Sequence, residues 1–221
     1  MEYLSIILPL PKTIYFNLRY LPLKQALKLP IFINYHCDIS KIKGKIKLLN
    51  QIKPALIRIG FHKVPAINTK DSTRIAIDSN GILEFDGSAH IGRGSKLYVS
   101  KNAKLHIGDN FAISASSSIL CYKSISFGRD IQFSWDCLVM DSDTHHIYNE
   151  AKEVMNSPKD IIFGNKIWIG CKSTILKGNN LPSNTVIGAC SCITDSHNIR
   201  PNTIIVGTPA KSVKEIGSWE L

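Results

Sequence analysis

Residues 163–194 read FGNKIWIGCKSTILKGNNLPSNTVIGACSCIT, and every sixth residue of this stretch, counted from Phe163, is large and apolar. The series continues beyond the stretch to Ile199 and Ile205. A period of six matches neither the helix period of 3.6 nor the two-residue alternation of a long strand. It is typical of the hexapeptide β-helix, in which three short strands and their corners form one coil of roughly 18 residues. The pattern therefore predicts an all-β chain folded as a parallel β-helix.

The same period occurs earlier in the chain. It runs through residues 107–125 and, after a slip of two residues, through 127–139, with a looser version over 85–103. Glycine often follows the apolar residue, as in Ile169-Gly170 and Ile187-Gly188. Glycine suits a crowded position beside a tight corner, where a side chain or a negative φ is costly.

Three regions are expected. Residues 71–210 form the β-helix, with about six coils and a polar insertion at 140–162 that lacks the hexads. Long insertions in rigid scaffolds often carry function. Residues 1–70 form a basic and apolar cap region. Residues 211–221 form a C-terminal capping tail, with a short helix over 212–219.

The basic charge of the N-terminal region has two interpretations. Between positions 24 and 53 seven lysines accompany one acidic residue, Asp38. Together with the preceding apolar residues, residues 1–60 suit contact with an anionic membrane. The alternative is a solvated basic cap over the open end of the β-helix. The whole chain has a net charge of +10, which suggests an anionic partner without naming it.

The sequence favours a cytoplasmic protein, and peripheral contact with the inner face of the membrane is compatible with it. The chain begins Met1-Glu2-Tyr3 without a basic segment, and its longest early apolar run, residues 4–10, is far shorter than the ~20 residues of a spanning helix. The six cysteines form no C-x-x-C pair, and we expect them to be reduced.

The hexads together with three motifs resemble those of the hexapeptide-repeat acyltransferases. The motifs are FGNKIWIGC at 163–171, IGACS at 187–191 and GTPAK at 207–211. Within that family the chain is most similar to the acetyl-CoA-dependent sugar and surface-polysaccharide O-acetyltransferases. The resemblance covers roughly residues 75–215. It implies a left-handed β-helix, a homotrimer, and acetyl-CoA bound between adjacent subunits, with a carbohydrate as acceptor and no nucleic acid partner.

The resemblance also implies a histidine general base on the inserted loop, and that histidine matches His145, with His146 as a variable neighbour. An imidazole with a pKa near 6.5 takes the proton of an attacking hydroxyl at neutral pH. Asp141 and Asp143 precede His145 by four and two residues, so they share its face in an extended segment. Asp143 is the better candidate to orient the imidazole or to bind a sugar hydroxyl.

The cofactor residues implied by the resemblance lie in the last third of the chain. The turn at 168–171 (Trp168, Gly170 and Cys171) matches the place where a backbone N–H meets the thioester carbonyl and stabilises the oxyanion. Ala189 and Thr194 match positions beside the pantetheine arm, and Lys211 matches a basic residue near the CoA phosphates. The chain departs from the family at Asp195, where lysine is common, and at 114–115, where asparagine is common.

Other functions remain to be weighed. An N-acetyltransferase acting on a nucleotide-linked aminosugar has the same fold, cofactor and base, and the sequence does not exclude it. A zinc enzyme of this fold needs three converging histidines, whereas His90, His106 and His197 are isolated in the sequence; no metal is expected. An ice-binding β-helix needs Thr-rich ladders, which the chain lacks.

Overall fold

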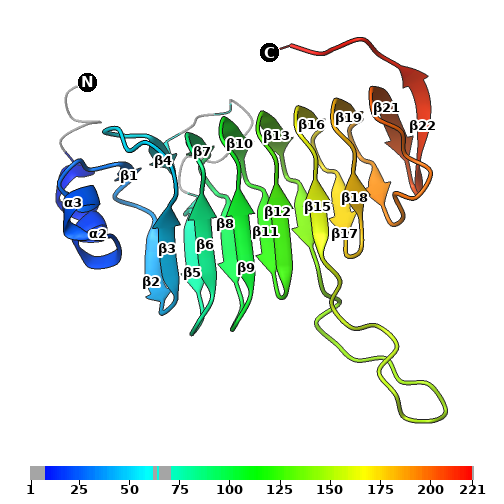
Figure 1. The fold of residues 1–221 in the computed structure, drawn as a ribbon, viewed down its shortest axis with the longest axis horizontal. Coiled ribbons are helices and arrows are strands. Elements are labelled where there is room, and N and C mark those ends of the chain that lie inside the picture. Colours follow the sequence, from blue (N-terminus) through cyan, green and yellow to red (C-terminus); the bar gives the residue numbers. More distant parts are fainter. Residues whose placement is uncertain (1–7, 62–63, 65–70, 221) are drawn as a thin grey trace.

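The computed structural model describes residues 8–61, 64 and 71–220. Within these ranges the chain forms two short helices at one end and a stack of short strands that extends to the other end (Figure 1). The strands belong to three sheets, named A, B and C here, which form the three sides of a prism. The parallel β-helix expected from the hexads is confirmed.

Each sheet collects one strand from each coil. Sheet A contains, in spatial order, β1 (Ile31–Ile33), β4 (Ile57–Ile59), β7 (Ala89–Ile91), β10 (Phe111–Ala115), β13 (Ile131–Trp135), β16 (Ile167–Ile169), β19 (Thr185–Ile187), β21 (Thr203–Gly207) and β22 (Ala210–Glu215). Sheet B contains β2 (Asp38–Ile42), β5 (Arg74–Ile77), β8 (Lys96–Val99), β11 (Ser118–Cys121), β14 (Leu138–Met140), β17 (Thr174–Leu176) and β20 (Cys192–Ile193). Sheet C contains β3 (Lys45–Leu48), β6 (Ile82–Phe85), β9 (Lys104–Ile107), β12 (Ser124–Phe127), β15 (Ile161–Phe163) and β18 (Asn180–Leu181).

The apolar residues of the hexads stack in columns inside the prism. In sheet A, Ile169 pairs with Ile187 and Ile187 with Ile205, and all three are fully buried. A step of six residues thus leads to the next sheet, and three steps lead to the same sheet one coil later. Phe163 and Leu181 form the equivalent pair in sheet C. Burial of these side chains from water is the main stabilisation of the stack.

The glycines that follow the apolar residues at the corners are required by the close approach of neighbouring coils and not by a positive φ of their own. A Cβ on Gly170 would lie 2.6 Å from the nitrogen of Ala189, and a Cβ on Gly128 would lie 2.4 Å from the oxygen of Gly164. These glycines are therefore required by the close approach of successive coils. The positive φ occurs two residues after the glycine, for example at Lys172 (φ 59°).

The β-helix begins earlier than expected. β1, β2 and β3 already form a coil between Ile31 and Leu48, and they pair with the strands of the next coil. The expected boundary at residue 70 is therefore wrong. The hexads are obscured here because eight residues separate β3 from β4, where three separate β6 from β7, and because the pairing of β2 with β5 shifts register between Asp38 and Lys41.

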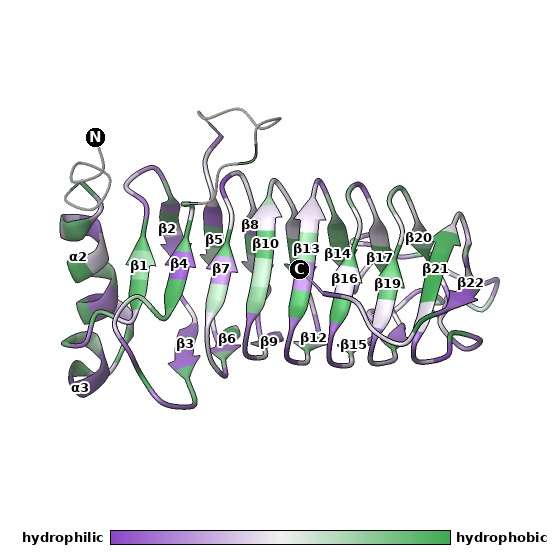
Figure 2. Cartoon of the chain, turned by 90° about the horizontal axis from the view of Figure 1, so that it is seen from above, coloured by the Kyte–Doolittle hydropathy of each residue, from purple (hydrophilic) through white to green (hydrophobic). Residues whose placement is uncertain are grey.

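Two helices, α2 (Leu10–Tyr20) and α3 (Leu23–Ala26), lie beside β1 at the first coil (Figure 2). The side-chain amide of Asn17 donates to the oxygen of Ile31 (2.7 Å) and accepts from its nitrogen (3.1 Å). Thr13 Oγ1 accepts from the nitrogen of Ile33 (3.0 Å). Side chains of α2 thus satisfy the edge of sheet A that would otherwise be open. In the described part of the chain, no helix is long and apolar enough to cross a membrane.

The C-terminal end differs from the expectation. The helix expected over 212–219 is wrong, because residues 210–215 form β22, which pairs antiparallel with β21. A polar strand on the last coil satisfies the backbone groups at that end of sheet A, which a helix would leave unpaired. Beyond it, Trp219 donates from Nε1 to the oxygen of Lys166 (3.0 Å), so the tail returns along the coils.

Candidate active site

A long loop between Met140 and Ile161 projects from the side of the prism (Figure 1). It corresponds to the polar insertion expected at 140–162. Its two ends are held together where the nitrogen of Lys159 donates to the oxygen of Asp141 (3.1 Å). Its middle folds back on itself through an antiparallel bridge between Tyr148 and Val154. The loop is therefore a folded element and not an extended strand.

Asp141, at the start of the loop, is fully buried. Its carboxylate accepts hydrogen bonds from three backbone N–H groups at the corner between β11 and β12: those of Tyr122 (2.6 Å), Lys123 (2.8 Å) and Ser124 (2.8 Å). Both oxygens are thus occupied inside the coil. Asp141 anchors the loop and does not contact His145. A role for Asp141 in orienting the imidazole is therefore not supported.

Asp143 lies at the surface and contacts two residues that the sequence did not suggest. Its carboxylate forms an ion pair with Lys177, which follows β17, and accepts from the amide of Asn156 (2.9 Å). The Lys177 ammonium, and then the Asn156 amide, hold the pKa of the Asp143 carboxyl below its ordinary value. Asp143 therefore positions the loop in this chain, and the imidazole of His145 is not among its partners here.

Asn156 holds the backbone on both sides of the histidine pair. Its Nδ2 donates to the oxygen of His145 (2.8 Å), and its Oδ1 accepts from the nitrogen of Ile147 (2.7 Å). Lys177 in turn donates to the oxygen of Asn156 (2.7 Å). Asn156, Asp143 and Lys177 thus form a network, called the loop clamp below, that determines the backbone conformation at 145–147.

The two histidines have different surroundings. Both are exposed, and the Nδ1 of His145 lies 3.1 Å from the hydroxyl of Thr144. In the tautomer in which Nδ1–H donates to Thr144, Nε2 carries the lone pair that a general base needs. The ring of His146 instead lies beside Tyr148, with centroids 6.1 Å apart. Thr144 therefore has the orienting contact that the sequence assigned to Asp143.

Four of the expected cofactor residues lie along the edge between sheets A and B. Gly170 and Cys171 follow β16, and Ala189 occupies the same corner one coil later, where Cys190 N donates to the oxygen of Cys171 (2.9 Å). Lys211 is reached at the end of this edge, through the pairing of β21 with β22. The fold thus places these four residues in a row along the edge between sheets A and B.

The backbone donors at this edge are not equivalent. The N–H of Gly170 donates to the oxygen of Ile187 (2.8 Å) and is therefore occupied within the coils. In the part of the chain that the structure describes, the N–H groups of Cys171 and Ala189 donate to no acceptor. These two donors, one coil apart, are available to a ligand. Of the residues expected to meet the thioester carbonyl through a backbone N–H, Cys171 has this group free and Gly170 has it bonded within the coils.

Trp168 and Thr194 lie apart from this edge. Trp168 is on the outer face of sheet A, 43% exposed, and its Nε1 donates to the hydroxyl of Ser134 (3.3 Å). Thr194 follows β20 on the opposite edge of sheet B, one coil beyond Leu176 and Lys177. That edge also bears the start of the loop. Sheet B therefore separates the histidine loop from the aligned donors of the same chain.

Metal ligation has no support in the described residues, where no group of three His, Cys, Asp or Glu is arranged to hold an ion. His90 lies on sheet A and His106 on sheet C. His197 follows β20 and contacts Asp195, the residue found where lysine is common in the family.

Comparison with known proteins shows what this chain is similar to. The galactoside O-acetyltransferase of Escherichia coli K12 is 30% identical over 122 residues, which cover 54% of this chain and 58% of that protein. A polysialic acid O-acetyltransferase of E. coli O1:K1 is 30% identical over 125 residues, covering 56% of this chain and 40% of that protein. This chain is similar to O-acetyltransferases of the hexapeptide-repeat family. The aligned part spans less than two thirds of either relative's length, and no family model matches the sequence.

Among solved structures, the polysialic acid-specific acetyltransferase NeuO has a TM-score of 0.63 at 19% identity, covering 87% of this chain and 79% of that chain. This likeness concerns the fold. The expected left-handed hexapeptide β-helix is thereby confirmed.

Proposed function

We propose that this protein transfers an acetyl group from acetyl-CoA to a hydroxyl of a carbohydrate during the assembly of a surface polysaccharide. The observation that carries the proposal is the set of hydrogen bonds that hold His145. Its Nδ1 is bound to Thr144, and its backbone oxygen is held by the loop clamp. The relatives are named as acetyltransferases of a galactoside and of polysialic acid, which supports a sugar hydroxyl as the acceptor.

In this mechanism Nε2 of His145 removes the proton of the acceptor hydroxyl as its oxygen attacks the thioester carbonyl carbon. A C–O bond forms, the C–S bond breaks, and the imidazolium returns the proton to the departing thiolate. General-base assistance of this kind contributes about 10²–10⁴-fold to a rate. The free N–H of Cys171 is suited to stabilise the negative charge that develops on the carbonyl oxygen.

We propose that the complete site requires a second copy of the chain and that the assembly is a homotrimer. Within one chain, sheet B separates the loop from the edge that bears Cys171 and Ala189. The outer face of sheet B also carries a column of apolar residues in register, formed by Ala76, Tyr98, Leu120, Met140 and Leu176. An apolar column on the side of a rigid prism suits a contact between copies, and threefold closure brings the loop of one chain to the edge of the next.

We place the protein in the cytoplasm, peripheral at the inner face of the membrane. Acetyl-CoA is the donor, and its phosphates are proposed to lie near Lys211, which is exposed at the end of the edge between sheets A and B. Thr194, on the other edge of sheet B, is proposed to contact the pantetheine arm through the neighbouring subunit.

The test compares His145→Ala with His146→Ala, using labelled acetyl-CoA and a panel of oligosaccharide and nucleotide-aminosugar acceptors. His145→Ala should lower kcat by about 10²–10⁴-fold with little change in the KM for acetyl-CoA. His146→Ala should retain most of the activity, because its ring lies against Tyr148. Equal losses, or a loss confined to His146→Ala, would refute the assignment. A product that resists mild alkali would be an amide and would identify an N-acetyltransferase.

A further inference from the structure

The helix that covers the first coil, α2, has a buried face and an exposed apolar face. One face is buried against β1 and includes Phe16, which is fully buried. The other face exposes Ile14, Tyr15 and Leu18, which are 40%, 56% and 51% accessible. An exposed apolar surface of this kind often marks a site of interaction. In the isolated chain, nothing among the described residues covers the outer one.

The same apolar surface continues onto α3. Leu23 and Leu27, one helical turn apart, are 65% and 71% accessible. Both helices lie at the end of the prism (Figure 1). The exposed apolar residues of α2, together with Leu23 at the start of α3 and Leu27 directly after it, are called the end face below and lie at the end of the stack and not on one of its sheets.

Basic residues accompany the end face. Lys12, Arg19, Lys24 and Lys28 belong to the helices or follow them, and the sequence contains no Asp or Glu between positions 3 and 37. An apolar surface with only positive charges around it is complementary to an anionic bilayer, in which acyl chains and negative headgroups lie within a few ångströms of each other.

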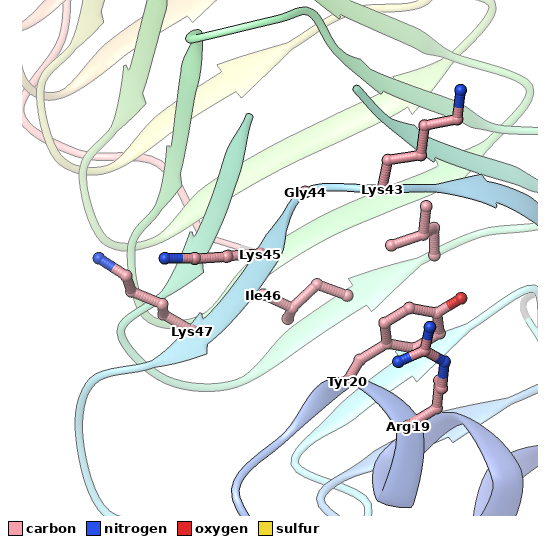
Figure 3. Close-up of a pocket in the computed structure, with 8 residues that line it drawn as sticks. Arg19, Tyr20, Lys43, Gly44, Lys45, Ile46 and Lys47 are labelled. Atoms are coloured by element: carbon pink, nitrogen blue, oxygen red, sulfur yellow. The ribbon is translucent and has the colours of Figure 1, made fainter. Parts of the chain in front are cut away.

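Basic residues also line a cavity beside the end face. Arg19 and Tyr20 of α2 lie opposite Ile46 of β3, and the side chains of Lys43, Lys45 and Lys47, which also line the cavity, point away from Arg19 (Figure 3). The cavity has a volume of about 460 Å³, and no acidic residue lines it. Lys47 alone of these lysines has an acidic partner in the described part of the chain, Glu84 (3.2 Å). These residues therefore add positive charge to the surface beside the end face.

We propose that the end face docks on an anionic lipid bilayer, with Leu18, Leu23 and Leu27 at the level of the acyl chains and Arg19 and Lys43 at the level of the headgroups. Tyr15 is suited to the interface between the two levels. This inference identifies the surface behind the peripheral location proposed above, and it does not depend on acetyl transfer. The loop with His145 leaves the prism at β14, several coils away (Figure 1), so docking leaves the candidate active site open.

The test is sedimentation of the full chain with vesicles of phosphatidylcholine alone and of phosphatidylcholine with phosphatidylglycerol. We expect binding to the anionic vesicles only, weakening as salt is added. Leu23→Gln with Leu27→Gln, and separately Lys24→Glu with Lys28→Glu, should each weaken binding by about tenfold or more.

Two matched controls carry the same chemical changes elsewhere. Val213→Gln alters an apolar residue that is 59% exposed at the other end of the chain, and Lys101→Glu alters an exposed lysine between β8 and β9. Both should bind like the unaltered protein. Circular dichroism, and acetyl transfer to a soluble acceptor, should be unchanged in every variant, which separates this proposal from the proposed function.

Three results would overturn the proposal. The first is an absence of vesicle binding, and the second is equal binding to neutral and anionic vesicles. The third is concentration-dependent self-association without lipid that Leu23→Gln with Leu27→Gln abolishes, which would make the end face a contact between copies.

Discussion

Replacing Asp141 with asparagine should destabilise the protein far more than the same change at Asp143, two residues further along. The Asp141 carboxylate is fully buried and accepts from three backbone N–H groups at 2.6–2.8 Å. A hydrogen bond to a charged group contributes about 1.5–3 kcal/mol, and an unpaired buried donor costs a similar amount. Asparagine offers one oxygen in place of two and directs an NH₂ group at the remaining donors.

We therefore expect Asp141→Asn to lower the free energy of unfolding by about 3–5 kcal/mol. The side chain of Asp143 is 41% exposed, and asparagine there still accepts from Lys177 and Asn156. Its effect on stability should stay within about 1 kcal/mol.

The measurement is urea unfolding of both variants followed by circular dichroism, at one protein concentration because assembly contributes to stability. Asp143→Asn should instead lower kcat, since it weakens the loop clamp. Equal losses of stability in the two variants, or a loss below about 1 kcal/mol for Asp141→Asn, would show that the three hydrogen bonds do not hold the corner.

Three further predictions concern other parts of the chain. Burial opposes ionisation of Glu84, but Lys104 and Lys47 hold its pKa below the ordinary value. The carboxylate therefore contributes stability above the unfolded pKa, and this contribution is lost as the pH falls through the folded pKa. Glu84→Gln should remove that part of the acid dependence in unfolding titrations. Asn156→Ala removes two hydrogen bonds to the backbone at 145–147 and should lower kcat by about tenfold with little change in the KM for acetyl-CoA; an unaltered kcat would refute the role of the loop clamp. Lys211→Ala should raise the KM for acetyl-CoA several-fold at constant kcat, and a KM that is insensitive to both salt and substitution would contradict the phosphate contact.

The hexads predicted the fold well where each coil is regular. Phe163, Ile169 and Ile175 lie on three different sheets, and the residues 18 positions later pair with them. The prediction failed at both ends. The first coil contains a register shift between Asp38 and Lys41, which removes the period, and the C-terminal strand is determined by its pairing with β21 and not by a pattern of its own.

The candidate site shows the same division. His145 was predicted from the loop and the family motif, and Cys171 and Ala189 were predicted from the family resemblance. The residues that hold the histidine were not. Lys177 is 34 positions from Asp143 and Asn156 is 13 positions away, and neither separation is a multiple of the six-residue period of the repeat.

The sequence by itself determined the β-helix, because a large apolar residue at every sixth position leaves only a coil of short strands in which all of them are buried together. It also determined which loop bears the histidines. Tertiary structure alone decided that Asp141 is an anchor, that Thr144 and not Asp143 contacts the imidazole, and that the helix at the first coil exposes an apolar face. The physical reason is that these roles depend on which corners stack on one another. A repeat specifies that coils stack, whereas the side chains that meet at an edge come from different coils and acquire partners only when the stack has formed.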